Sequence, residues 1–498
     1  MATGHRSGRR RVAPLLVAAA LVAAACTAPA EVPLVRFPVG AGGPSLVTAI
    51  DADTVGPLHL DGTHLVDADG RVVLLHGVNA VVKQAPWYPQ IPTQLGPADE
   101  TYFRDNGFNA VRLGVWFSQL EPQPGVIDTA YLDRVSTVVD WFEARHIWVL
   151  FDFHQDVYWG MPDWATSPAA AALSDVAPDW AKAVGWGAAY LSPRSIQQWT
   201  ELYADATIAT DPTRHLWDAL SEGAAAMATR FASRANTVGI ELLNEPFPTD
   251  YPRCVLGGCP DIEARLAAMY EQMTTSIRSV APDLPVWWEP ASSAPGWGDT
   301  ALPAPSQPGV GFAWHTYCYA TDGGTLDPAS DFDRARCGSF IPTSFDRAQR
   351  MSAGWDRPQL MTEFGASKNP LDATLVTREA DARMVSWFHW HHYFQGTSGG
   401  LLPPEEVQAQ LTRVYPQATA GVPLSMAFDP ATGAFEYHYR PDATATAATS
   451  IVVPARHYPD GYVANVSGGI ITSAPNSGRL QVEATPGATE VTVTVTRA

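Results

Sequence analysis

The chain has 498 residues, of which 46% are hydrophobic and 17% are charged, enough apolar material for a large packed core and more than one domain. Its formal net charge of −19 argues against a nucleic-acid partner, because proteins that bind the phosphate backbone need an excess of basic residues. The same charge excludes a general attraction to anionic lipid, so any contact with a membrane has to be local and apolar.

The first 30 residues have the organisation of an export signal. A basic stretch at 5–12 precedes an apolar run at 13–25 that is too short to span a bilayer. We expect secretion after cleavage at Ala30, with a lipid anchor on Cys26 as the alternative. The rest of the sequence contains no run that is long and apolar enough to predict a transmembrane helix.

Residues 31–410 begin with a hairpin that two Asp-Gly turns indicate, and then alternate short apolar strands with helical stretches. Residues 131–146 are one such helix, in which Leu132, Val135 and Val139 recur at the spacing of a single helix face. The eight predicted strands are the one that ends at Asn79 and those at residues 109–115, 147–153, 237–243, 286–289, 311–315, 359–363 and 386–390. This alternation predicts a (β/α)₈ TIM barrel of the α/β class.

A second domain is predicted at residues 411–498, where helical periodicity stops. Alternating strands such as 435–440 and 490–496 lie there between turns rich in Gly, Pro and Asn, which is typical of a small β-sandwich. Its expected role is packing and stability, with a carbohydrate-binding or membrane-binding module as the alternative.

Four cysteines remain after the expected signal, and an even number fits an oxidising compartment. Three pairings are open, of which proximity in the sequence favours Cys254 with Cys259 and Cys318 with Cys337. A zinc site is disfavoured, because the two pairs lack the usual close spacing and an accompanying histidine.

Polar residues gather at the carboxyl ends of the predicted strands, which form the active face of a TIM barrel. They are Asn79, Arg112, Asp152, His154, Asp156, Asn244, Glu245, His315, Tyr317 and Glu363. Glu245 and Glu363 follow the fourth and seventh strands. Two such carboxylates suit glycoside hydrolysis with retention, if they lie about 5–5.5 Å apart, because one can donate a proton while the other attacks the anomeric carbon.

The neighbours of this pair have expected roles as well. We expect Asn244 to bond a sugar hydroxyl beside the reacting carbon, and Arg112 and Tyr317 to keep Glu363 ionised. His154 and His315 are interpreted as hydrogen-bonding partners of the carboxylates and of substrate, and not as metal ligands, because no chelating motif accompanies them. No cofactor motif occurs either, since the first strand is not followed by a Gly-rich turn.

The motifs LLNEPF and MTEFGAS, together with AVRLGV, FDFHQD and FAWHTY, resemble glycoside hydrolase family five over residues 70–395. Within that family, HGVNAVVKQAPWYP, VLFDFHQDVYWG and VVPARHYPDGYVANVSGG look like the endoglycoceramidases, which separate the glycan of a glycosphingolipid from its ceramide. The resemblance implies that Glu245 is the acid/base and Glu363 the nucleophile. It further implies that the sugars and the first polar atoms of the ceramide are bound by Lys83, Asp152, Asp156, Asn244 and Tyr317. Trp390 then forms the floor of the subsite at the cleavage point.

The last strand departs from the family pattern. Trp390 is followed by His391 and His392, where a Trp-x-Tyr-Lys pattern is expected, so Trp387 is an alternative platform and the preferred sugar stays open. Lys83 is one of only three lysines in the chain, the others being Lys182 and Lys368, which favours a specific role over simple surface exposure.

Residues 157–199 are unusually aromatic, with Trp159, Trp164, Trp180, Trp186 and Trp199 beside Tyr158, Met161 and Tyr190. Such rings stack on sugars or present an apolar surface to lipid. We expect about half of them to pack the loop onto its neighbours, and the others to form an exposed patch that leads to the two glutamates.

The leading hypothesis is a secreted, monomeric endo-glycosidase that releases oligosaccharide from glycosphingolipids, with peripheral contact to a membrane or micelle. The same chemistry on a soluble β-glucan or β-mannan is the second. A catalytically silent glycan-binding surface protein is the third, and the presence of both glutamates in intact motifs argues against it.

Overall fold

The computed structural model describes residues 46–498 apart from 51–52, 54, 180–187, 252, 255–257, 293, 319–330, 367–368 and 393–402. The expected export signal with Ala30 and Cys26 therefore lies outside the described residues, as do Lys182 and Lys368. None of the helices in the described part of the chain has the length and hydrophobicity needed to cross a bilayer.

Eight parallel strands close into a barrel, which confirms the predicted TIM-barrel fold. In spatial order they are β4 (His76–Ala80), β5 (Ala110–Val115), β6 (Trp148–Phe153), β9 (Thr237–Glu241), β10 (Val286–Trp288), β11 (Val310–Thr316), β12 (Gln359–Gly365) and β13 (Ser386–Trp390), and β13 pairs back with β4. β9 ends at Glu241, two residues before the predicted end, and the backbone N–H of Leu242 still donates to Trp287.

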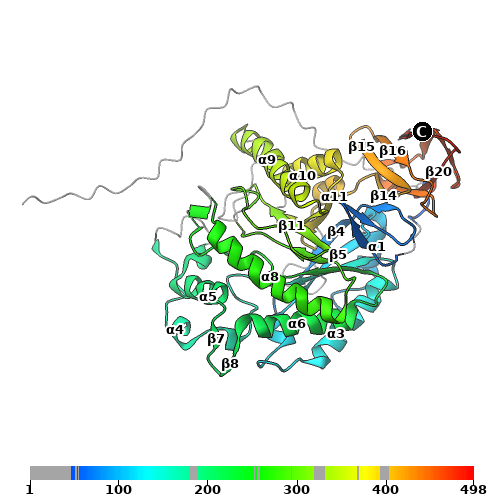
Figure 1. Ribbon diagram of the computed structural model, residues 1–498. Helices are drawn as coiled ribbons and strands as arrows, with labels where there is room; N and C mark the ends of the chain where they lie inside the picture. Colours follow the sequence, from blue (N-terminus) through cyan, green and yellow to red (C-terminus); the bar gives the residue numbers. More distant parts are fainter. Residues whose placement is uncertain are drawn as a thin grey trace, which may run out of the picture. The chain divides into compact units, whose positions relative to one another are not determined.

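Helices surround the barrel, as Figure 1 shows for α3, α6 and α8. The helices are α1 (Pro97–Asn106), α2 (Phe117–Leu120), α3 (Thr129–Glu143), α4 (Pro168–Ala171), α5 (Pro193–Tyr203), α6 (Leu216–Phe231), α8 (Pro260–Val280), α9 (Asp331–Trp355), α10 (Pro370–Arg383) and α11 (Glu405–Leu411). In α3 the side chain of Asp128 caps the N-terminus by accepting the N–H of Tyr131, and the predicted apolar face of this helix is buried. A short hairpin, β7 (Thr207–Ile208) and β8 (Asp211–His215), separates α5 from α6.

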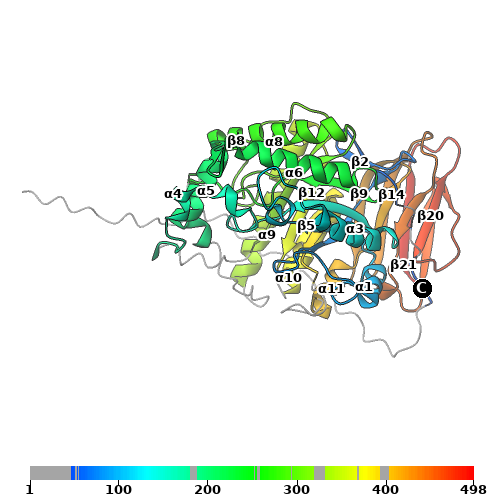
Figure 2. The same ribbon diagram turned by 90° about the horizontal axis from the view of Figure 1, so that it is seen from below.

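The C-terminal domain consists of two antiparallel sheets, as the sequence predicts, and Figure 2 shows its strands side by side. Its strands are β14 (Tyr415–Thr419), β15 (Gly421–Asp429), β16 (Ala434–Pro441), β17 (Thr449–Val452), β18 (Tyr462–Ser467), β19 (Gly469–Ile471), β20 (Arg479–Ala484) and β21 (Val491–Arg497). Side chains from both sheets, such as Ile451 and Val493, share one buried apolar cluster.

The N-terminal strands belong to the same sheet system. They are β1 (His59–Asp61), β2 (His64–Val66) and β3 (Val72–Val73), and β3 pairs with β14 of the C-terminal domain. The sequence predicts the hairpin but not this pairing, because no local pattern indicates which distant strand completes a sheet. The domain boundary at residue 411 stays a prediction.

The C-terminal domain contacts the barrel at the amino ends of the barrel strands. His76, the first residue of β4, stacks on Tyr415 of β14 with ring centroids 3.7 Å apart. The hydroxyl of Tyr415 donates to the carbonyl of Gly107, which precedes β5, over 2.8 Å. A buried ion pair joins Arg413 to Asp381 of α10. These contacts lie at the end of the barrel opposite to the carboxyl ends of its strands.

Candidate active site

Arg112 of β5 is the centre of a buried polar network at the carboxyl ends of the strands. Its guanidinium donates to Glu363 over 2.7 Å, to Glu241 over 2.7 Å and to Asn244 over 2.9 Å, and it lies 3.0 Å from Asp152. Arg112 itself is fully buried. A buried cation among three carboxylates is stable only with several hydrogen bonds, and the planar guanidinium supplies them in fixed directions.

Glu363 of β12 has the environment of an ionised carboxylate. Arg112 donates to its Oε1, and the hydroxyl of Tyr317 donates to its Oε2 over 2.6 Å. Both oxygens are thus held by donors, and a carboxylate that is fixed in this way is a ready nucleophile. Arg112 and Tyr317 therefore lie where the sequence predicts them.

Glu245 follows β9 and has a different environment. Burial raises its pKa to about 7, and the nearby charge of Asp156 acts in the same direction. Its Oε1 lies 3.0 Å from Nδ1 of His315. Burial lowers the pKa of His315 to about 3, so this imidazole is neutral at pH 7. Glu245 is therefore suited to carry a proton, while both carboxyl oxygens of Glu363 accept hydrogen bonds.

The two carboxyl groups lie close together. An oxygen of Glu245, an oxygen of Glu363 and a ring nitrogen of His315 are all within 4.8 Å of one another. Inverting glycosidases hold their carboxyl groups about 6.5–9.5 Å apart to admit a water molecule, and retaining ones hold them at about 5–5.5 Å. The arrangement can therefore support a nucleophile and a proton donor on the same glycosidic bond.

A second chain of polar contacts leads from this network towards the loop after β4. Nδ1 of His154 lies 2.7 Å from Asp152, its Nε2 lies 3.6 Å from Asp156, and Asp156 pairs with Lys83 over 2.6 Å. Burial disfavours the charged forms of Asp152 and His154, but the neighbouring opposite charges outweigh it, so the pKa of Asp152 is lowered and that of His154 is raised. Against the same effect of burial, His154 and Lys83 lower the pKa of Asp156.

Trp390 forms one wall of this polar chain. Its ring stacks on His154 with centroids 5.5 Å apart, and Nζ of Lys83 lies 4.4 Å from the ring centroid. Trp387, the alternative platform, is fully buried in the barrel core and stacks on His76. The structure thus brings Trp390 and Lys83 together, while their roles in binding sugar stay predictions.

The side chain of Asn244 makes hydrogen bonds within the protein that the sequence does not indicate. Its side-chain oxygen accepts from Arg112, and its NH₂ group donates to the backbone carbonyl of Gln155 over 2.9 Å. One N–H of the amide remains for a further partner. Asn79 lies deeper, where it accepts from Arg112 and donates to the carbonyl of Thr362.

Sequence reasoning missed two buried carboxyl groups of the site. Glu241 of β9 bonds Arg112 and Thr362, and burial raises its pKa to about 7. Glu289 directly follows β10, and its Oε2 accepts the backbone N–H of Glu245 over 2.9 Å. The available signal was a charge inside or directly after an apolar strand, as in IELL and VWWE.

Two groups of side chains in the described part of the chain have the composition of a metal site. They are Glu241, Glu289 and His315, and Glu245, His315 and Glu363. The guanidinium of Arg112 bonds one carboxylate of each group, so a cation already offsets part of their negative charge. That the protein uses no metal and no cofactor stays a prediction.

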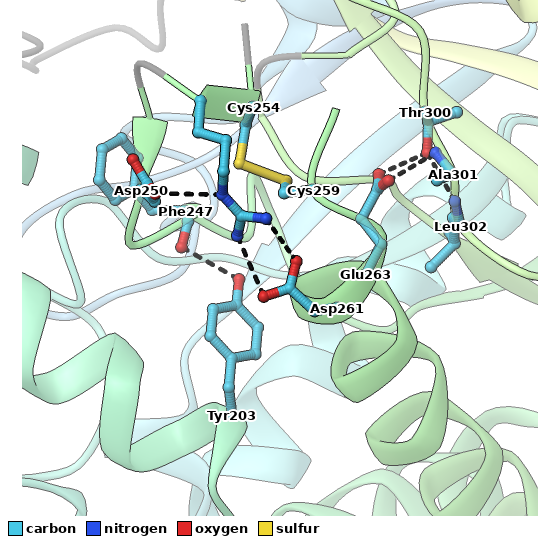
Figure 3. Close-up of a disulfide and its surroundings, with 11 residues drawn as sticks. Tyr203, Phe247, Asp250, Cys254, Cys259, Asp261, Glu263, Thr300, Ala301 and Leu302 are labelled. Carbon is cyan, nitrogen blue, oxygen red and sulfur yellow. Dashed lines mark hydrogen bonds and ion pairs between the residues drawn. A yellow bond between two sulfur atoms is a disulfide. The ribbon is translucent and has the colours of Figure 1, made fainter. Parts of the chain in front are cut away.

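Both disulfides favoured by the sequence are present, Cys254 with Cys259 and Cys318 with Cys337. Figure 3 shows the first, which closes the loop that follows Glu245. On one side of it, the hydroxyl of Tyr203 donates to the carbonyl of Phe247 over 3.0 Å. On the other, Glu263 of α8 accepts from Thr300 and Ala301. The bridge thus lies between two groups of hydrogen bonds on the active face of the barrel.

Most of the described members of the aromatic segment are buried. Its buried members are Tyr158, Met161, Trp164, Tyr190 and Trp199, while Trp180 and Trp186 lie outside the described residues. Trp159 is 50% exposed and contacts the rings of Trp87 and Trp116 edge-on. Trp116 in turn packs against His154. The exposed ring therefore connects to the polar chain described above.

Comparison with known proteins gives a consistent family. Residues 66–395 match the model of the cellulases of glycosyl hydrolase family 5, and residues 413–496 match the glycoside hydrolase family 5 C-terminal domain. Endoglycoceramidase I of Rhodococcus hoagii is 37% identical over 462 residues, which cover 90% of this chain and 89% of that protein. An endoglycoceramidase of Cyanea nozakii is 26% identical over 472 residues, covering 83% of this chain and 87% of that protein.

Solved structures agree with these relatives. The complex of endo-glycoceramidase II from Rhodococcus sp. with ganglioside GM3 superimposes with a TM-score of 0.70 and 26% identity, and the match covers 88% of this chain and 100% of that one. The barrel, the C-terminal sheets and the paired glutamates thus occur in a chain that resembles these proteins over nearly its whole length.

Proposed function

The chain belongs to glycosyl hydrolase family 5, and on that premise we propose that it is an exported, retaining endo-glycosidase that separates the glycan from the ceramide of glycosphingolipids. The observation that carries the proposal is the pair Glu245 and Glu363, two neighbouring carboxyl groups in opposite environments. The similarity to endoglycoceramidase I over 90% of the chain supports the substrate class.

The proposed reaction proceeds by double displacement. The carboxylate of Glu363 attacks the anomeric carbon and forms a covalent glycosyl ester, while the carboxylic acid of Glu245 gives its proton to the departing ceramide oxygen. Glu245, now a carboxylate, takes a proton from water, and the resulting hydroxide displaces Glu363 from the same carbon. The product keeps the configuration of the substrate, and Glu245 is protonated again.

The polar chain of Lys83, Asp156 and His154, with Trp390 beside it, supports a glycan on that side of the glutamates. Charged groups of both signs donate to and accept from hydroxyls, and an indole ring stacks on the apolar face of a sugar. We also propose local contact with a micelle or membrane on the side of the departing ceramide. We further propose that the basic and apolar leader directs export and that the protein acts as a monomer.

The experiment is a product analysis of the purified protein. It is incubated with mixed gangliosides and neutral glycosphingolipids, and in parallel with carboxymethylcellulose and a soluble mannan. Release of intact oligosaccharide together with free ceramide is the expected result. Cleavage of the polysaccharides alone would contradict the glycolipid substrate and favour the second hypothesis from the sequence.

Two variants test the mechanism in the same assay. Glu363→Gln removes the nucleophile without changing its shape, and we expect turnover to fall at least about 10³-fold. Glu406→Gln is the matched control, because Glu406 is exposed on α11, where the neighbouring Glu405 pairs with Arg456 of the C-terminal domain. An unchanged rate for Glu363→Gln would refute the assignment of the nucleophile.

A further inference from the structure

Glu289 is a buried carboxyl group that contacts Glu245 and His315. It is 2% exposed, and its Oε2 accepts the backbone N–H of Glu245 over 2.9 Å. Its Oε1 lies 3.4 Å from Nδ1 of His315, the ring nitrogen that also faces Glu245. Its backbone is fixed in turn, because the hydroxyl of Tyr270 donates to its carbonyl over 3.1 Å. Glu289 therefore touches both the main chain of Glu245 and the ring beside it.

The backbone of Glu245 needs such support. Its φ angle is +42°, in the left-handed region that non-glycine residues rarely adopt. The next residue is Pro246, and a residue before proline favours extended conformations. A non-glycine residue held in such a region is strained, and this conformation persists only where surrounding contacts fix it. The hydrogen bond to Glu289 is a contact of this kind.

The charges around Glu289 favour its neutral form. Glu241 of β9, Glu245 and Glu363 of β12 surround His315 together with Glu289, and the nearest permanent cation is Arg112 of β5. Burial raises the pKa of Glu289 well above its usual range, Glu241 and Glu245 raise it further, and Arg112 opposes them. A neutral carboxyl group still accepts the N–H of Glu245 through its carbonyl oxygen.

We propose that Glu289 is a positioning residue for the proton donor, whose carboxyl group holds Glu245 in its left-handed conformation and keeps the His315 ring against it. This inference rests on the proposed function, because it takes Glu245 as the acid that protonates the leaving group. It assigns Glu289 no contact with substrate. Its loss therefore weakens acid catalysis selectively and leaves the nucleophile in place.

The test uses two variants of the full chain and a series of aryl β-lactosides. Glu289→Gln keeps the length of the side chain and a carbonyl oxygen, so it imitates the neutral acid. Glu289→Asp keeps the acid but shortens its reach by one methylene group, so the bond to Glu245 is lost. Aryl lactosides with poor leaving groups need a proton from Glu245. The dinitrophenolate of dinitrophenyl lactoside departs without one.

For Glu289→Asp we expect kcat/KM to fall about 10²-fold on poor leaving groups and by less than about threefold on dinitrophenyl lactoside, the selective loss typical of a disabled general acid. Glu289→Gln should stay within about threefold of the parent on both substrates, with an unchanged pH profile. An equal loss on all leaving groups would show a merely structural role and overturn the proposal. Equal losses in the Gln and Asp variants would overturn it too, because they would show that a carbonyl oxygen with the same reach does not replace the carboxyl group.

Failure of this inference is separable from failure of the proposed function. Cleavage of gangliosides by the parent protein reports on the function, whereas the ratio of variant to parent across leaving groups reports on Glu289. If Glu289→Asp does not fold, Glu289→Gln alone still decides, because a selective loss of more than about tenfold in that variant contradicts the neutral acid.

Discussion

At the residue scale, the site depends on the guanidinium of Arg112, which contacts some of its carboxyl groups and not others. Arg112 donates a hydrogen bond to Glu363. On the side of Glu245, it donates to Asn244, the residue that precedes Glu245 in the chain. Arg112 therefore binds the carboxyl group of Glu363, while burial raises the pKa of Glu245 to about 7. Two chemically identical side chains thus acquire opposite tasks from their surroundings.

The pH dependence of activity follows from the pKa of Glu245, which is about 7. The protonated form is the active one, so kcat/KM on a glycosphingolipid should fall as the pH rises through that value, by about tenfold per pH unit above it. The measurement is a pH profile of initial rates at low substrate concentration.

The control for this profile is dinitrophenyl lactoside, whose leaving group needs no proton. Its formation of the glycosyl ester should lack the alkaline decline near pH 7. A decline at the same pH on both substrates would assign the titration to another group, and a glycolipid profile that stays flat up to pH 9 would contradict the raised pKa.

The sequence indicates site residues where an apolar strand carries a charged side chain, as at Arg112 of β5 and Glu363 of β12. It fails where the meaning of a residue depends on strands that are distant in the chain. Glu289 becomes informative only when β9 and β11 bring Glu245 and His315 against it. The different environments of Glu245 and Glu363 are likewise a product of the closed barrel.

At the element scale, the eight barrel strands overlap their predicted ranges, because each is a short apolar run between helical stretches. The exceptions are tight turns at the site. Val157 and Tyr158 both have positive φ angles, +56° and +71°, between Asp156 and Trp159, whose backbone groups bond each other. Such a turn normally requires Asn or Gly, so local sequence chemistry does not indicate it. Backbone strain of this kind is found at functional sites, where surrounding contacts hold it.

The disulfides give a prediction at the same scale. Replacing both cysteines of a pair by serine should lower the free energy of unfolding more for Cys318–Cys337 than for Cys254–Cys259. The bridges span 19 and 5 residues, and the chain-entropy relation gives about 3 and about 2 kcal/mol for loops of these lengths. Denaturant unfolding of the two double variants under oxidising conditions measures the difference.

The second readout for these variants is activity. The bridge between Cys254 and Cys259 closes the loop after Glu245, so its loss should lower turnover of glycolipid while the smaller stability change leaves the fold intact. A larger loss of stability for this pair than for the longer loop would contradict the entropic ranking.

At the scale of the whole molecule, the C-terminal domain lies at the end of the barrel opposite to Glu245 and Glu363. It contacts the amino ends of the strands through Tyr415, and Arg413 pairs with Asp381. This arrangement agrees with a role in stability, which the sequence favours over direct contact with substrate. The sequence indicates the sheets from their alternation, but not which end of the barrel they cover.

Removal of residues 411–498 should therefore unfold the barrel rather than alter its specificity. The truncation exposes apolar side chains that pack on the domain, such as Leu74, and each buried side chain of this size contributes about 1.5–3 kcal/mol against a total stability of about 5–15 kcal/mol. Soluble yield and circular dichroism of residues 31–410, beside those of residues 31–498, measure the effect. A soluble, active barrel would show that the domain is dispensable.

The pairing of β3 with β14 has a consequence for the order in which the protein is made. Val72 and Val73 leave the ribosome early, whereas their partners Thr419 and Ala418 follow only after the whole barrel sequence. Until then the edge of β3 presents unpaired N–H and C=O groups, and unpaired strand edges in a nascent chain invite pairing with other molecules. The sheet that covers the base of the barrel is therefore completed last, and a chain released before β14 is synthesised cannot close it.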